Sequence, residues 1–129
     1  MMIEHVAFQH PDPIGAADWY GKNFQMKVVR ESSGPSKCRF LAEANGKTIL
    51  EIYDQSTAAP MPDYPTMSPF NLHIAFSSSD IAADVERLVA NGAKLIEAPN
   101  TIASGDQLAM LRDPWGVPVQ LVKRAKPLL

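Results

Sequence analysis

The stretch Asn71-Leu72-His73-Ile74-Ala75-Phe76 decides the fold, because its pattern occurs twice in the chain. Its large apolar residues alternate in period two, which predicts a strand with one hydrophobic face and with His73 on the opposite face. Near the N-terminus, Ile3-Glu4-His5-Val6-Ala7-Phe8 has the same order of histidine, aliphatic residue, alanine and phenylalanine, 68 positions earlier (73 minus 5). Two equivalent histidines on two similar strands indicate an internal duplication.

The rest of the chain supports this duplication, since both halves predict the order strand, helix, strand, strand, strand. Ile14-Gly-Ala-Ala aligns with Ile81-Ala-Ala-Asp, and Lys27-Val-Val with Lys94-Leu-Ile, each at an offset of 67. A polar loop is predicted at Ala98–Gly105. The predicted strands and helices are Ile3–Phe8, Ile14–Asn23, Met26–Arg30, Lys37–Ala42, Thr48–Tyr53, Asn71–Phe76, Ile81–Gly92, Lys94–Glu97, Gln107–Arg112 and Val117–Lys123.

The sequence therefore predicts an α+β fold in which one domain, 1–129, consists of two modules at about 1–53 and 70–123. The connection 54–69 contains four prolines and no sustained periodicity, which is typical of a linker or an ordered loop. A chain of 129 residues can bury enough surface to fold without a disulfide or a metal.

Composition excludes several classes of function. The net charge of −2 gives no electrostatic basis for binding nucleic acid. Cys38 is the only cysteine, so it cannot form an intrachain disulfide, and a reducing compartment is expected. No apolar run approaches membrane-spanning length, and no signal segment is recognisable. We expect a cytoplasmic protein with neither a nucleic-acid nor a membrane partner.

Four polar residues occupy equivalent positions in the duplicated modules. The last predicted strands correspond at an offset of 69 (120 minus 51), which places Glu51 over Gln120, each between apolar neighbours. If those neighbours pack against the helices, alternation directs His5, Glu51, His73 and Gln120 to the other, concave face. Two imidazoles, a carboxylate and an amide oxygen suit a divalent metal ion such as Zn, Ni, Fe, Mn or Co.

Each of these residues also has a simpler interpretation. A strand histidine is often a structural hydrogen-bonding residue, Glu51 could belong to the wet face of a two-sided strand, and Gln120 alone carries little signal. Their equivalent places in two modules favour one shared site. His10 lies outside the pattern, beside Pro11, and is predicted to be a surface loop residue.

The chain resembles the vicinal oxygen chelate superfamily, the glyoxalase/bleomycin resistance/extradiol dioxygenase group. The residues that carry the resemblance are Ile3–Phe8, Trp19-Tyr20, Leu50-Glu51-Ile52, Leu72–Phe76, the Ile81–Gly92 helix and Asp113-Pro-Trp-Gly-Val-Pro-Val-Gln-Leu. The resemblance implies two βαβββ modules whose sheets curl around a metal-centred cleft, with His5, Glu51, His73 and Gln120 as ligands. It also implies that the metal chelates two adjacent substrate oxygens and stabilises an enediolate or a related species.

The sequence departs from the family pattern at the last ligand position, where Gln120 replaces the usual Glu. The ligand set is less negative by one charge, and an amide cannot accept a proton as a general base. Glu51 is the only carboxylate of the four and would have to perform any proton transfer.

The resemblance leaves three functions open. The first is a metal-dependent lyase or isomerase similar to glyoxalase I, acting on a small-molecule substrate with vicinal oxygens. The second is a non-catalytic protein that binds a small molecule of the antibiotic type. The third is an extradiol-type dioxygenase with iron on His5, His73 and Glu51. A homodimer is expected, because many relatives pair. Four further strand residues receive no role from the sequence: Arg39, Tyr53, Met110 and Arg112.

Overall fold

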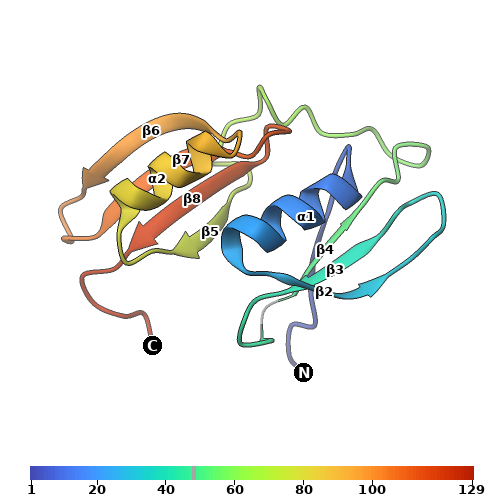
Figure 1. Ribbon diagram of the computed structural model, residues 1–129, viewed down its shortest axis with the longest axis horizontal. Helices are drawn as coiled ribbons and strands as arrows, with labels where there is room; N and C mark the ends of the chain where they lie inside the picture. The colour runs from blue at the N-terminus through green and yellow to red at the C-terminus, as the bar shows by residue number, and fades with distance from the viewer. Residues whose placement is uncertain (48) are drawn as a thin grey trace. The chain divides into compact units, whose positions relative to one another are not determined.

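Two four-stranded mixed sheets, each with one helix, make up the fold (Figure 1). The structure is a computed structural model that describes residues 1–47 and 49–129. Thr48, predicted to start a strand, lies outside the described residues. By its internal contacts the chain divides into unit 1, Met1–Pro62, and unit 2, Asp63–Leu129, and each is described by itself.

Unit 1 contains the predicted strand, helix, strand, strand, strand order. Its sheet has the strand order β1-β4-β3-β2, in which β1 runs parallel to β4 and the other pairs are antiparallel. The elements are β1 (Val6–Gln9), α1 (Pro13–Phe24), β2 (Lys27–Glu31), β3 (Arg39–Ala42) and β4 (Ile49–Tyr53). The Asp12 side chain caps α1 by accepting from the backbone N–H of Gly15 across 3.0 Å.

Unit 2 repeats this topology with the order β5-β8-β7-β6 and a parallel β5–β8 pair. The elements are β5 (Ile74–Ser77), α2 (Ile81–Ala90), β6 (Lys94–Thr101), β7 (Gln107–Arg112) and β8 (Pro118–Lys123). Asp80 caps α2 as Asp12 caps α1, accepting from the backbone N–H of Ala83 across 3.1 Å. Neither described helix has both the length and the apolar character needed to cross a membrane.

Several strand boundaries differ from the prediction. β1 and β5 begin at Val6 and Ile74, so both histidines directly precede their strands. β6 continues to Thr101, and the predicted loop at Ala98–Gly105 therefore starts too early. The strand includes Pro99, which the sheet tolerates because β6 is an edge strand and its pairing with β7 is irregular there.

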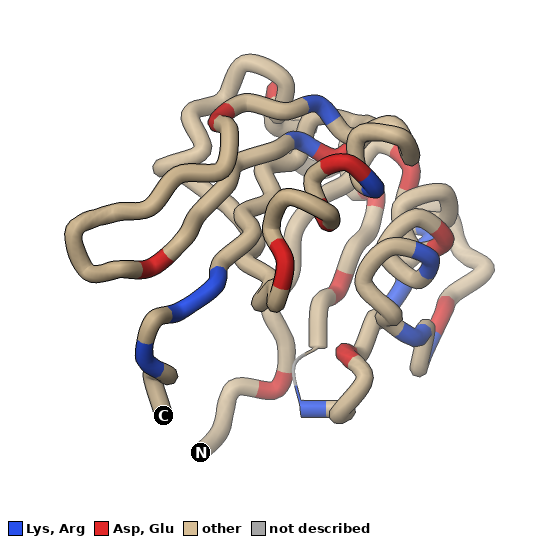
Figure 2. Tube along the Cα trace, turned by 60° about the vertical axis from the view of Figure 1, so that its left-hand side comes forward, with Lys and Arg blue, Asp and Glu red and all other residues tan. Residues whose placement is uncertain are grey.

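The core of each unit lies between the helix and one face of its sheet. In unit 1, Tyr20 of α1 and Ile52 of β4 are fully buried, and in unit 2 Leu88 of α2 and Leu111 of β7 are fully buried. Figure 2 shows acidic and basic residues interspersed along the trace, with no long run of one sign.

The prediction for His10 is wrong, because this side chain is fully buried. Its backbone N–H donates to the carbonyl of Tyr53 across 2.8 Å, which extends the β1–β4 ladder by one residue. Its Nδ1 accepts from the backbone N–H of Asp12 across 3.0 Å and thus supports the start of α1. The neighbouring proline indicated a surface loop, but the additional hydrogen bond of the parallel β1–β4 pair places the His10 side chain in the buried interior.

Side chains of both units form hydrogen bonds to the backbone of the proline-rich connection. In unit 1, the side-chain amide of Gln9 donates to the carbonyls of Ala59 and Pro60, each across 3.2 Å. In unit 2, the buried guanidinium of Arg112 donates to the carbonyls of Tyr64 and Met67 across 2.6 and 2.8 Å. Arg112 is therefore a structural clamp on the segment that opens unit 2.

Gly116 completes the anchoring of this segment. It lies in the turn between β7 and β8 with a φ of +99°, and a Cβ at this position would lie 2.7 Å from ring and backbone atoms of Pro65. The Asp113 carboxylate shapes the turn by accepting from the backbone N–H groups of Trp115 and Val117. The Asp-Pro-Trp-Gly motif thus forms a tight turn whose glycine packs directly against Pro65 of the connection.

Candidate metal-binding half-sites

The first half-site consists of His5 and Glu51. Glu51 lies in the middle of β4 opposite Ala7 of β1, and alternation places His5 on the same face as Ala7. His5 Nε2 lies 3.0 Å from Glu51 Oε2, and the two side chains are 33% and 22% exposed. The pair is therefore in direct contact and accessible from outside the sheet.

His5 lies between two carboxylates, since its Nδ1 contacts Glu4 while its Nε2 faces Glu51. The hydrogen bond from Glu4 raises the pKa of His5 above its ordinary value, partial desolvation opposes this effect, and the charges of Glu4 and Glu51 add to it. Loss of the Nε2 proton would turn this nitrogen into a metal donor. Glu4 would then orient the ring from behind.

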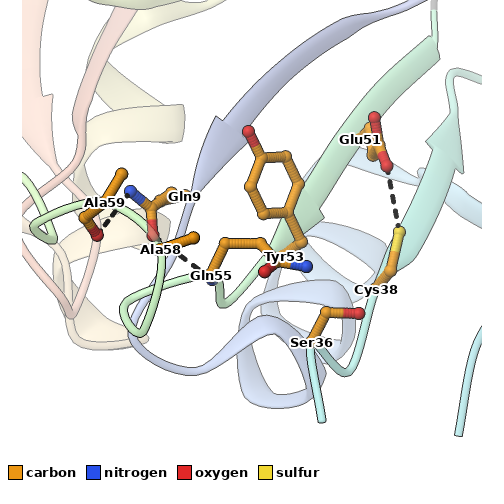
Figure 3. A pocket seen from close by; sticks show the side chains of 8 residues that line it. All are labelled: Gln9, Ser36, Cys38, Glu51, Tyr53, Gln55, Ala58 and Ala59. Atoms are coloured by element: carbon orange, nitrogen blue, oxygen red, sulfur yellow. Dashed lines mark hydrogen bonds between the residues drawn. The ribbon is translucent and has the colours of Figure 1, made fainter. Parts of the chain in front are cut away.

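Cys38 contacts the other oxygen of Glu51, an arrangement that the sequence did not reveal. Its Sγ donates to Glu51 Oε1 across 3.3 Å (Figure 3). The pKa of the Cys38 thiol is raised to about 11. Burial is the main cause, and the hydrogen bond and the charge of the Glu51 carboxylate add to it. The thiol is therefore protonated near neutral pH, and its hydrogen bond helps to orient the Glu51 carboxylate.

A cavity of about 440 Å³ opens beside Glu51 and Cys38 (Figure 3). Tyr53, one of the residues without an assigned role, lines it. Arg39 does not, because its guanidinium donates to the carbonyls of Ser32, Lys37 and Cys38. The residues that line the cavity are Gln9, Ser36, Cys38, Glu51, Tyr53, Gln55, Ala58 and Ala59. Its size suits a small organic molecule.

The second half-site consists of His73 and Gln120 and repeats the backbone placement of the first. Gln120 lies opposite Ala75 in the β5–β8 pair, as Glu51 lies opposite Ala7, and each histidine precedes its alanine by two residues. His73 Nδ1 lies 2.8 Å from the carbonyl oxygen of Pro69. A carbonyl only accepts, so Nδ1 donates and Nε2 of the neutral ring keeps its lone pair.

An apolar cavity of about 450 Å³ lies beside Gln120 in unit 2. Met110, the last of the residues without an assigned role, forms part of its wall. The lining residues are Pro69, Phe70, Ile96, Glu97, Asn100, Ile102, Leu108, Met110 and Gln120. The two half-sites thus border cavities of different character, since the cavity of unit 1 is mixed polar and apolar and that of unit 2 is largely apolar.

The donor sets fit a divalent metal ion. Two ligands at about 2.1 Å from a metal and at right angles to each other lie about 3 Å apart, as His5 Nε2 and Glu51 Oε2 do. Metal-binding histidines usually donate their second N–H to a carboxylate or a carbonyl, and Glu4 and Pro69 provide these acceptors. Among the described residues, no group of three His, Cys, Asp or Glu side chains is arranged so that it could hold a metal ion, and joint binding by both half-sites stays a prediction.

The comparisons with known proteins support the family. The family model of the Glyoxalase/Bleomycin resistance protein/Dioxygenase superfamily matches residues 2–121. No curated protein sequence matches. These results, with the observed topology, confirm the predicted superfamily and the α+β fold of two βαβββ modules.

Several solved structures share the fold. A glyoxalase family protein from Bacillus cereus is 16% identical, with 95% of this chain and 93% of that chain covered and a TM-score of 0.79. Glyoxalase I from Zea mays is 23% identical with a TM-score of 0.74, and the match covers 95% of this chain but 44% of the maize chain. TioX from Micromonospora sp. ML1 is 15% identical, with 99% and 100% covered and a TM-score of 0.64. At these identities the likeness shows the fold alone.

Proposed function

Since the chain belongs to the glyoxalase/bleomycin resistance protein/dioxygenase superfamily, we propose that it is a metal-dependent lyase or isomerase similar to glyoxalase I. Its substrate would be a small molecule with two adjacent oxygen atoms. The observation that carries the proposal is that each histidine contacts an oxygen acceptor through Nδ1, so that Nε2 is the nitrogen available to a metal, and in His5 this nitrogen lies 3.0 Å from Glu51, another residue of the proposed ligand set.

The residues that would hold the metal are His5 and His73 through Nε2, Glu51 through its carboxylate and Gln120 through its amide oxygen. When bound, a divalent ion such as Zn, Ni, Fe, Mn or Co supplies Lewis acidity toward a carbonyl and a hydroxyl oxygen on adjacent carbons. With one carboxylate among four ligands, the site neutralises less of the ion's charge than a site with two carboxylates would.

Glu51 would move the proton between the adjacent substrate carbons. It is the only carboxylate of the four, and Gln120 has no basic atom for this task. His5 and Cys38 fix the carboxylate from both oxygens, which gives it one orientation toward the cavity of unit 1. Such positioning is what a group that transfers a proton requires.

Metal analysis of protein purified without an affinity tag tests the proposal. We expect a stoichiometric divalent metal, or an increase in Tm when Ni, Zn, Mn or Fe is added. Glu51→Gln should keep part of the metal binding but lose proton exchange at the substrate carbon. The proposal is wrong if no metal binds, and an unchanged exchange rate in Glu51→Gln would remove Glu51 as the base.

The second candidate function is binding of a small molecule without catalysis. The largely apolar cavity in unit 2 favours it, because mostly apolar walls with a few polar side chains suit the binding of a small organic ligand. Ligand binding that persists after treatment with a chelator would support this alternative. An extradiol-type dioxygenase, with iron on His5, His73 and Glu51, ranks third and would consume oxygen in the presence of a catechol. We also propose a homodimer, which sedimentation analysis can test.

A further inference from the structure

Both units contain a β-bulge at the equivalent position. In unit 1 the pairing of β2 with β3 passes from Val28–Leu41 to Arg30–Phe40, which leaves Val29 as the extra residue. In unit 2 the pairing of β6 with β7 passes from Leu95–Leu111 to Glu97–Met110, which leaves Ile96 extra. The offset between the bulges is 67 (97 minus 30), as in the aligned motifs.

The bulge determines the face on which Arg30 lies. In regular pairing Val29 would lie opposite Phe40, and Arg30 would lie on the face covered by α1. The extra residue reverses this alternation, so Arg30 joins a row across the sheet with the half-site. From edge strand β2 across the sheet to edge strand β1, this row is Arg30, Phe40, Glu51 and Ala7.

Arg30 and His5 both lie against the ring of Phe40. The guanidinium carbon of Arg30 lies 6.0 Å from the centroid of the Phe40 ring, and the ring of His5 meets Phe40 edge-on at 5.5 Å. A cavity of about 330 Å³ opens at this point. Its lining residues are Glu4, His5, Val29, Arg30, Phe40 and Ile49.

The nearby carboxylates have other partners. Glu4 and Glu51 contact the two nitrogens of His5, and Glu31 pairs with Arg39. Among the described residues, no aspartate or glutamate forms an ion pair with Arg30. A planar cation that lies over an aromatic ring, with no carboxylate paired to its N–H groups, is well suited to bind the carboxylate of a ligand.

We propose that Arg30 binds a carboxylate of the substrate and that Val29, Phe40 and Ile49 contact its apolar body. The substrate is then a small organic acid with an aliphatic portion. Its carboxylate lies at Arg30 while the reacting carbons face the half-site of His5 and Glu51. The assignment of reacting carbons rests on the proposed function, but the binding of the acid at Arg30 does not.

A matched pair of probes tests the proposal on the full-length protein as purified. Isovalerate and isovaleramide have the same shape and differ in charge, and amide NMR signals report where each binds. We expect isovalerate to shift the signals of residues 29, 30, 40 and 49 and to bind at least about tenfold more tightly than the amide. Binding of both probes with equal affinity, or of neither, would overturn the proposal.

Variants of strand β2 identify the residue responsible. Arg30→Met should weaken isovalerate at least about tenfold and leave isovaleramide unchanged, whereas Arg30→Lys should keep part of the discrimination. Lys27→Gln removes one positive charge from the same strand, opposite Ala42 and away from Phe40, and should bind isovalerate as the parent does. An equal loss in Lys27→Gln would show a general charge effect and contradict the assignment. Phosphate binding as tight as isovalerate would contradict the role of the apolar walls.

The same experiment separates this proposal from the proposed function. Repeated after dialysis against a chelator, the preference for the acid should persist because Arg30 supplies it. Absence of metal with a retained preference would remove the proposed function and leave the site at Arg30. A bound metal without any preference for isovalerate over isovaleramide would contradict the site at Arg30 and leave the proposed function in place.

Discussion

His73 donates its Nδ1–H to the carbonyl oxygen of Pro69 across 2.8 Å, and this bond decides which nitrogen of the ring can bind a ligand. In unit 1, Glu4 occupies the corresponding place on His5. The two acceptors differ in charge, because one is a backbone carbonyl and the other a carboxylate. The two half-sites should therefore respond differently to changes behind the histidines.

We expect Glu4→Gln to weaken binding of Zn²⁺ by roughly 10–100-fold, the usual effect of losing a carboxylate that orients a metal-binding histidine. The amide would contact His5 without strengthening its basicity. Competition with a chromogenic chelator measures the change. Glu86→Gln removes the same charge from an exposed position of α2 and should leave the affinity unaltered. Equal affinities in Glu4→Gln and the parent would exclude a supporting role for Glu4.

Gln120→Glu should raise the affinity for a divalent metal by about tenfold or more, because a second carboxylate enters the ligand set. The change also restores the family pattern at this position. The same chelator competition measures it. The control is Gln107→Glu on β7, an exposed residue paired with Lys123, which adds equal charge away from the half-site. An equal gain in both variants would indicate a general electrostatic effect.

Cys38 should react slowly with iodoacetamide at pH 8, where a thiol with a pKa of about 11 is ionised in about one molecule per thousand. The Glu51 carboxylate disfavours the neighbouring thiolate, so Glu51→Gln should lower the pKa and accelerate the reaction. The pH dependence of alkylation, followed by mass spectrometry, measures both effects. The unfolded protein provides the reference rate of an ordinary thiol. A rate in Glu51→Gln equal to that of the parent would contradict the contact.

Gly116→Ala should lower the free energy of unfolding by more than about 2 kcal/mol, because the backbone is left-handed there and the new methyl group would overlap Pro65. Urea denaturation measures the loss. Gly34→Ala is the matched control, since Gly34 has no neighbouring atom within 4 Å of an added Cβ and no positive φ. Gly34→Ala should be neutral or stabilising by up to about 1 kcal/mol. Similar losses in both variants would argue against the contact with Pro65.

The sequence predicted the features that depend on periodicity. Duplication and the βαβββ order follow from local patterns, because hydrophobic alternation and helical periodicity act over a few residues. Glu51 and Gln120 were recognised as equivalent through their offset, and the strand pairings give them equivalent registers.

Other features depend on pairing between strands and had no local signal. The bulge at Val29 moves Arg30 to the opposite face, whereas a regular strand would have placed it under α1. Cys38 meets Glu51 only because β3 and β4 are neighbours. His10 is buried by one additional hydrogen bond of the parallel ladder. Each of these depends on register, which a single sequence does not contain.

The two anchors on the proline-rich connection leave a very short tether. Gln9 holds the carbonyl of Pro60 and Arg112 holds that of Tyr64, so three residues, Met61 to Asp63, join the anchored points. Four Cα–Cα steps span at most about 14 Å. A tether this short should add little to the entropy cost of folding, because the cost of closing a loop grows with its length.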